Sequence, residues 1–231
     1  MLVRVTLARA LCEAARPLSI VPILCCAAPI ASAGEPPWPG FVPDPQTAEN
    51  LTLAGTTWTS EEPTHTVHLR QVDQAERLRY IEGRTGVAVD PYAAPAGQDP
   101  PIISFLLVIE NRGDAVLSFN ALDCWLTTNR QQIETPLGLT DLSFDYLIAG
   151  LSMPAAYQRV APVLLEGTRT LAPGESLSGL LIYHAVDARA RRFHIDVELT
   201  APTGDKMSLR APYRRPKDRD APPGEGAGPS S

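Results

Sequence analysis

Two short apolar runs constrain the fold of this chain most strongly. Ile102–Ile109 and Gly179–Val186 are apolar at nearly every position, and turn residues border them at Glu110–Asp114 and Leu171–Glu175. Runs of this length that are apolar on both faces are typical of strands covered on both sides. We therefore predict that each run is a central strand of a sheet.

Other segments alternate between apolar and polar residues, as strands do when one face is buried and the other is wet. Thr66–Val72 and Arg192–Thr200 are the clearest, and Pro202–Asp205 supplies a loop to a return strand with Met207 and Leu209 inward. Shorter candidates are Leu78–Glu82, Val87–Val89, Val116–Phe119 and Leu122–Thr127. About seven to nine short strands joined by Pro and Gly turns predict a mainly β chain, folded as an antiparallel immunoglobulin-like sandwich. The alternative fold is a β-barrel.

Two segments of the chain resemble a known family. Phe105–Asn111 (FLLVIEN) and Leu171–Tyr183 (LAPGESLSGLLIY) are similar to the two halves of small bacterial extracytoplasmic immunoglobulin-like domains of unassigned function. The resemblance spans roughly the stretch from the first alternating strand to the last. It implies a role in interaction or in the cell envelope, and it transfers no catalytic residue.

The region Leu139–Leu165 interrupts the strand pattern. Thr140–Leu147 suits a capped short helix, and Pro154–Leu165 suits another. These helical pieces are too short to bury all their apolar residues in a core of their own: Leu142, Phe144, Tyr146, Leu147, Ile148, Leu151, Met153 and Tyr157.

Two interpretations of this helical excursion remain open. It could cover an edge or an end of the sandwich, because sheet edges need protection. Alternatively, part of it stays exposed and binds a partner or a second copy of the chain. In that case the predicted partner-binding residues are Phe144, Tyr146 and Tyr157, because aromatic side chains are enriched among those that dominate binding energy.

The N-terminus predicts export. Arg4, Arg9 and Arg16 precede an uncharged stretch, Leu18–Ala33, that ends in Ala-Ser-Ala. This is the pattern of a secretory signal with a peptidase site, and the stretch is too short to span a bilayer. We expect residues 1–33 to be removed and the mature protein to be periplasmic or extracellular, with no transmembrane span. The alternative is a lipoprotein anchored at Cys25 or Cys26, although neither follows the small residue that a lipobox requires.

Composition divides the rest of the chain. Residues 34–63 are rich in proline and predict an extended linker, residues 64–213 have the size of one domain, and residues 214–231 lack large apolar side chains and predict a disordered tail. The formal net charge of −6 argues against nucleic acid as a partner. Once the signal is removed, Cys124 is the remaining cysteine. Alternation places it on the face of Leu122 and Leu126, so we expect a buried, inert thiol.

The chain contains few candidates for chemistry. His65 and His68 are three residues apart, so in a strand they point to opposite faces and cannot bind one ion. His184 and His194 lie on strands that could pair, but a structural metal site needs more ligands. Ser176 lacks the spacing and the following helix of a nucleophile elbow.

We therefore predict no catalytic residue, no metal and no cofactor. The predicted function is a non-enzymatic binding or accessory module of the cell envelope, which acts through another envelope protein. The alternatives are a hydrolase, for which Ser176 and His184 would be the candidates, and a metal-binding periplasmic protein, with His184 and His194.

Overall fold

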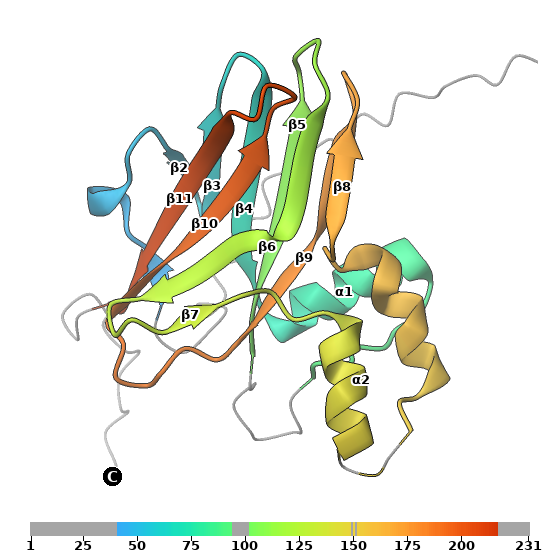
Figure 1. The fold of residues 1–231 in the computed structure, drawn as a ribbon. Coiled ribbons are helices and arrows are strands. Elements are labelled where there is room, and N and C mark those ends of the chain that lie inside the picture. The colour runs from blue at the N-terminus through green and yellow to red at the C-terminus, as the bar shows by residue number, and fades with distance from the viewer. Residues whose placement is uncertain (1–40, 94–101, 149, 151, 217–231) are drawn as a thin grey trace, which may run out of the picture. The chain divides into compact units, whose positions relative to one another are not determined.

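The computed structural model describes residues 41–93, 102–148, 150 and 152–216. The predicted signal, residues 1–33 with Cys25 and Cys26, lies outside these ranges, as do Leu151 and most of the predicted tail. Within them, the strands form two antiparallel sheets (Figure 1). The described strands do not close into one barrel, which confirms the mainly β sandwich over the alternative.

Sheet A has the order β1-β11-β10-β6-β7, and β8 also pairs with β6. Its strands are β1 (Val42–Pro43), β6 (Leu117–Thr128), β7 (Ile133–Glu134), β8 (Thr168–Leu171), β10 (Arg192–Thr200) and β11 (Lys206–Arg214). Sheet B has the order β2-β3-β4-β5-β9. Its strands are β2 (Thr52–Ala54), β3 (Thr57–Glu61), β4 (His65–Val72), β5 (Ile102–Asn111) and β9 (Ser176–His184).

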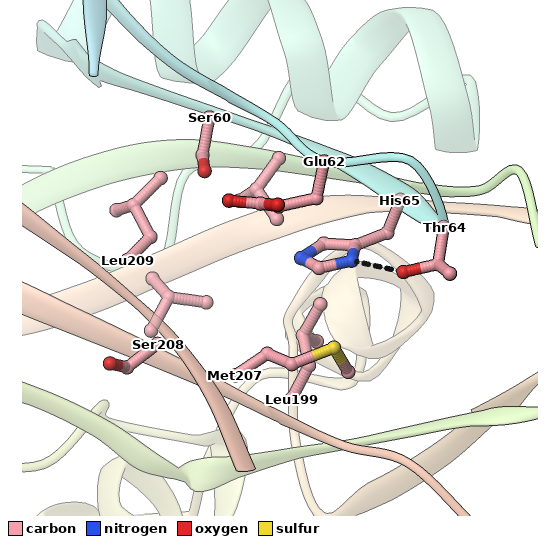
Figure 2. Close-up of a pocket in the computed structure, with 10 residues that line it drawn as sticks. Ser60, Glu62, Thr64, His65, Leu199, Met207, Ser208 and Leu209 are labelled. Carbon is pink, nitrogen blue, oxygen red and sulfur yellow. Dashed lines mark hydrogen bonds between the residues drawn. The ribbon is translucent and has the colours of Figure 1, made fainter. Parts of the chain in front are cut away.

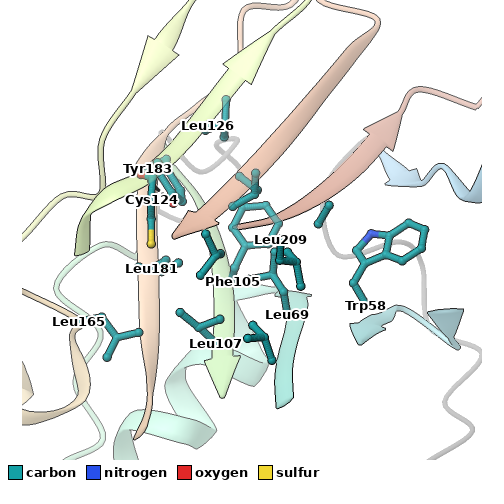
Figure 3. Close-up of a cluster of buried hydrophobic side chains, with 14 of the residues drawn as sticks. Trp58, Leu69, Phe105, Leu107, Cys124, Leu126, Leu165, Leu181, Tyr183 and Leu209 are labelled. Carbon is teal, nitrogen blue, oxygen red and sulfur yellow. Dashed lines mark hydrogen bonds between the residues drawn. The ribbon is translucent and has the colours of Figure 1, made fainter. Parts of the chain in front are cut away.

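The main core lies between the inner faces of the two sheets (Figure 3). Aromatic rings link the layers: Phe105 of β5 makes edge-to-face contacts with Phe193 and Tyr213, and these two rings stack with their centroids 4.9 Å apart. Such pairs favour one arrangement of the sheets beyond what area burial alone provides.

The two apolar runs are both strands buried on both faces, β5 and β9, but only β5 is central. The prediction that the second run is a central strand is wrong, since β9 ends sheet B. Its outer edge is partly protected by the segment just before the excursion and by the last residue of the excursion. Leu137 donates its N–H to the carbonyl of Ile182 (2.6 Å), and Leu165 donates to that of Leu180 (3.0 Å). These two hydrogen bonds pair backbone groups that the edge strand would otherwise leave open to another chain.

Helix α1 (Gln74–Thr85) and the 3₁₀ helix η2 (Ala155–Val163) cover part of the outer face of sheet B (Figure 1). Helix α2 (Leu139–Ile148) contacts η2, and a short 3₁₀ helix, η1 (Pro45–Thr47), lies elsewhere. Ile81 of α1 and Val160 of η2 pack with Leu180 and Ile182 of β9 in a second core. None of the helices in the described ranges has the length and apolar composition of a membrane span.

Helix α1 corrects the prediction of a strand at Leu78–Glu82. The side chain of Asp73 caps the helix by accepting a hydrogen bond from the N–H of Glu76. The side chain of Glu76 in turn accepts one from the N–H of Asp73. This capping box fixes the first turn, and Gly86 ends the helix at a positive φ of 69°. The predicted strand at Val87–Val89 is also wrong, because that segment is a loop.

The two strands predicted at Val116–Phe119 and Leu122–Thr127 form one irregular strand, β6. Its register with β10 shifts between Phe119 and Cys124, so a bulge separates the halves. The bulge exposes Leu122, which corrects the prediction that it shares the face of Cys124. Cys124 itself is buried as expected, and burial raises the pKa of its thiol to about 12.

Residues 41–63 do not form the extended linker that their composition predicted. They contain β1, η1, β2 and β3, and β3 pairs with β4 along its whole length. Trp58 is fully buried, and the ring of Phe41 contacts that of Phe193 at 4.9 Å. Two aromatic anchors thus attach a proline-rich segment to the sandwich.

Candidate functional site

A cavity of about 340 Å³ lies beside helix α2, which we call the α2 groove. Its walls come from α2, from the loop before β5 and from the end of β9. The lining residues are Pro91, Tyr92, Ala93, Ile102, Leu137, Asp141, Leu142, Phe144, Asp145 and His184. Its volume falls within the usual range for ligand or side-chain pockets.

The start of α2 is held by two carboxylates. Asp141 accepts the N–H of Gly138 at 2.8 Å, and Glu166 accepts the N–H of Leu139. These N–H groups have no partner inside the helix, so the carboxylates satisfy them and also complement the positive end of the helix dipole. The first turn of α2 is therefore fixed to the segment that leads into β8.

The opposite wall depends on a buried ion pair. The Arg77 guanidinium of α1 lies 2.7 Å from the Asp90 carboxylate, and the two side chains are only 2% and 3% exposed. Arg77 also donates to the hydroxyl of Ser104 on β5 (2.9 Å). Asp90 in turn accepts the N–H of Tyr92 at 3.0 Å, which places Tyr92 in the groove wall.

Tyr92 joins the two walls. Its hydroxyl donates to the carbonyl of Gly138 at 3.0 Å. Burial raises the pKa of Tyr92 well above its ordinary value, and nearby carboxylates, Glu166 foremost, add to this effect. The phenol is therefore a neutral hydrogen-bond donor at any physiological pH. It connects the loop before β5 to the residue that precedes α2.

Three apolar side chains on α2 face solvent, and we call them the exposed stripe. Phe144 is 59% exposed, and Leu147 and Ile148 are each 70% exposed. Positions i, i+3 and i+4 share one face of a helix, so these side chains are neighbours. Phe144 also lines the α2 groove, which makes the stripe continuous with the cavity. Grouped exposed apolar side chains of this kind mark interaction sites.

The structure separates the three predicted partner-binding residues. Phe144 belongs to the exposed stripe, whereas Tyr146 and Tyr157 are half-buried and contact each other edge to face, with ring centroids 6.1 Å apart. A side-chain hydrogen bond with Tyr146 raises the pKa of Tyr157. Partner binding by these residues stays a prediction. Sequence reasoning did not select Leu147 and Ile148, although their spacing from Phe144 was the available signal.

The residues considered for chemistry do not come together. Ser176 and His184 occupy opposite ends of β9, about 26 Å apart at the rise of an extended strand. His184 and His194 belong to different sheets, so the idea that their strands pair is wrong. His194 instead contacts Asp196, with 3.1 Å between Nε2 and Oδ2. Across the described residues, no three His, Cys, Asp or Glu side chains group as metal ligands would.

No family model matches the chain, and no curated protein matches its sequence. The yjhA protein from Bacillus subtilis, a crystal structure, is similar with a TM-score of 0.34 and 15% identity over 60% of this chain and 76% of that one. An X-ray structure of the structural genomics target SoR45 has a TM-score of 0.31 and 9% identity over 69% of this chain and 92% of that one. These TM-scores are too low for either likeness to support a function.

Proposed function

We propose that this protein is an exported, non-enzymatic binding module of the cell envelope, and that it docks an envelope protein through α2. The observation that carries the proposal is the exposed stripe of Phe144, Leu147 and Ile148 beside the α2 groove. A partner that covers the stripe removes three apolar side chains from water, and because they are 59–70% exposed, each contributes only part of the roughly 1.5–3 kcal/mol that full burial of such a side chain gives. The aromatic ring of Phe144 is the expected energetic centre.

The rigidity of the surface also supports docking. Asp141 and Glu166 fix the start of α2, and Tyr92 attaches the preceding residue to the loop before β5. A surface that is already ordered loses little conformational entropy when a partner binds. The half-buried pair Tyr146 and Tyr157 ties α2 to η2, and in this proposal it helps to hold the helix in place.

Strand order supports the immunoglobulin-like part of the proposal. In sheet B, β4-β5-β9 are adjacent in the order that strands A, B and E take in an immunoglobulin domain. In sheet A, β6-β10-β11 correspond in the same way to strands C, F and G. The excursion with α2 and η2 then occupies the connection before strand E, where such a domain tolerates insertions.

Export rests on the sequence of residues 1–33 and is tested separately. N-terminal sequencing of the protein from envelope fractions should give a mature chain that begins at Gly34. A lipid-bearing start at Cys25 or Cys26 would replace the soluble envelope module with an anchored one. A chain that still begins at Met1 and stays in the cytoplasm would overturn the export part of the proposal.

Docking is tested by capture of a crosslinked partner from envelope extracts. The stripe variant Phe144→Ser/Leu147→Ser/Ile148→Ser should lose a partner that the wild-type protein captures. The matched control is Leu122→Ser/Ile133→Ser, because these two exposed apolar residues lie on sheet A, away from α2. All three proteins should remain folded, since each substitution of an exposed residue changes stability by about 0.5 kcal/mol or less, which is at most about 1.5 kcal/mol for the triple variant; urea denaturation checks this. Equal capture by the stripe variant contradicts the proposal.

A further inference from the structure

A second cavity, of about 230 Å³, lies between the two sheets near the hairpin that joins β3 to β4 (Figure 2). Its apolar walls include Leu199 of β10 with Met207 and Leu209 of β11, and its polar side is formed by the hairpin residues Glu62 and His65. The cavity shares no lining residue with the α2 groove. It is therefore a separate site, and it is tested separately from docking through α2.

His65 presents a free hydrogen-bonding atom to this cavity. The residue is only 5% exposed, and its Nδ1 lies 3.1 Å from the hydroxyl oxygen of Thr64. The other ring nitrogen, Nε2, points into the cavity (Figure 2) and has no hydrogen-bond partner within the described part of the chain. Burial lowers the pKa of His65, so the ring is neutral at pH 7 and Nε2 can accept a proton donor. Nε2 is not among the fully buried unpaired polar atoms of the described chain, so it is open to water or to a ligand.

The charge at the mouth of the cavity is negative. Figure 2 shows the Glu62 carboxylate over the cavity, on the same side as the ring of His65. Glu62 forms no ion pair with a described residue, so its charge is not neutralised locally. A ligand that places a positive group here is attracted, whereas an anion is repelled.

We propose that this cavity binds a small primary amine that carries one ring or a short branched chain. The apolar part lies between Leu199, Met207 and Leu209, and the ammonium group donates one hydrogen bond to His65 Nε2 and another to the Glu62 carboxylate. The tautomer with a proton on Nδ1 suits this role, because that nitrogen then donates to Thr64. The size is suitable, since an apolar cavity of about 150 Å³ already accepts benzene.

The test uses benzylamine as the probe and a mature chain labelled with ¹³C at the methionine methyl groups. Met207 lines the cavity, and Met153 lies in the helical excursion and serves as the internal control. Benzylamine has eight non-hydrogen atoms, so we expect weak binding and titrate it up to about 10 mM. It should shift the Met207 signal to saturation and leave that of Met153 in place. Benzoate at the same concentrations should shift neither signal. A Met207 signal that does not move, or that moves equally with benzoate, overturns the proposal.

Two variants test the residues that recognise the amine. Glu62→Gln removes the charge from an exposed side chain and should weaken benzylamine binding about tenfold, the loss expected for a charge-assisted hydrogen bond. The matched control, Glu61→Gln, changes the neighbouring exposed carboxylate and should bind as the wild-type protein does. His65→Leu should weaken binding further; because it alters a buried residue, Glu62→Gln is the decisive variant. Equal affinity of Glu62→Gln and wild type overturns the assignment.

Discussion

At the scale of single residues, Arg77 and Asp90 matter most for the candidate site. They form an ion pair in the interior, and the Arg77 guanidinium also contacts Ser104. The pair holds the loop that carries Tyr92 into the wall of the α2 groove. Removal of one partner leaves a buried charge without compensation, which is far more harmful than loss of an exposed pair.

We therefore expect Arg77→Met to lower the free energy of unfolding by about 3–5 kcal/mol. The matched control is Arg70→Met, which breaks the partly exposed pair with Glu76 and should cost less than about 1 kcal/mol. Urea denaturation followed by circular dichroism measures both. If the two variants lose similar amounts of stability, Asp90 is not buried as described.

His65 makes folding stability depend on pH. Burial lowers the pKa of His65 in the folded chain, so the unfolded chain takes up a proton first when the pH falls below about 6.5. The contribution of the neutral ring is complete above that pH and is lost as the pH falls toward the folded pKa. We expect His65→Gln to show a smaller loss of stability than wild type between pH 7 and pH 5, measured by urea denaturation at each pH. An identical slope in His65→Gln and wild type would contradict this explanation.

At the scale of elements, the beginning of α2 determines whether the exposed stripe is presented as a helix face. The side chain of Asp141 accepts a hydrogen bond from the N–H of Gly138, whereas the side chain of Asp145, one turn later, forms no hydrogen bond among the described residues. Capping contacts of this kind contribute about 0.3–1.5 kcal/mol each.

We expect Asp141→Ala to speed amide exchange in α2 by about twofold to tenfold. Loss of a capping contribution of about 0.3–1.5 kcal/mol raises the equilibrium constant for local opening of the helix by roughly this factor. Hydrogen exchange measured by mass spectrometry on peptides that cover α2 detects the change. Asp145→Ala removes the same charge without the capping bond and should exchange nearly as slowly as wild type. Equal acceleration in both variants would mean that charge, rather than the cap, stabilises the helix.

The elements that the sequence predicted well are those with a clear local period. The amphipathic strand β10, its partner β11 and the doubly buried β5 follow from alternation or continuous apolar character. The short stretch Leu78–Glu82 alternates between apolar and polar residues, and this alternation predicts a strand where the structure has helix α1. The capping pair Asp73 and Glu76 is the sequence signal that marks the start of the helix. The sequence of β9 is apolar on both faces, which predicts a central strand, but β9 lies at the end of sheet B and helical residues bury its outer face. An apolar pattern shows that a strand is buried on both faces and does not show which elements bury it.

At the scale of the whole described fold, the remaining differences come from long-range contacts. Proline content predicted a linker, but β1 pairs with β11, more than 160 residues later, and β3 pairs with β4. The sequence predicted that the excursion would either cover a sheet edge or present apolar residues, and its segments do both: Leu165 covers the edge of β9 while Phe144 is exposed. Which of its apolar residues are exposed depends on how α2 packs, and no local pattern encodes that packing.

The central claim is that the exposed stripe on α2 contacts another protein. Photo-crosslinking in the cells that produce the protein tests it most directly, with a photoreactive amino acid placed at Leu147 and, as the control, at Leu122, which is exposed and apolar but lies on β6. We expect position 147 to give a discrete adduct with an envelope protein, position 122 to give none, and Phe144→Ser/Ile148→Ser to abolish the adduct at position 147. No adduct at position 147, or the same adducts from both positions, would contradict the account.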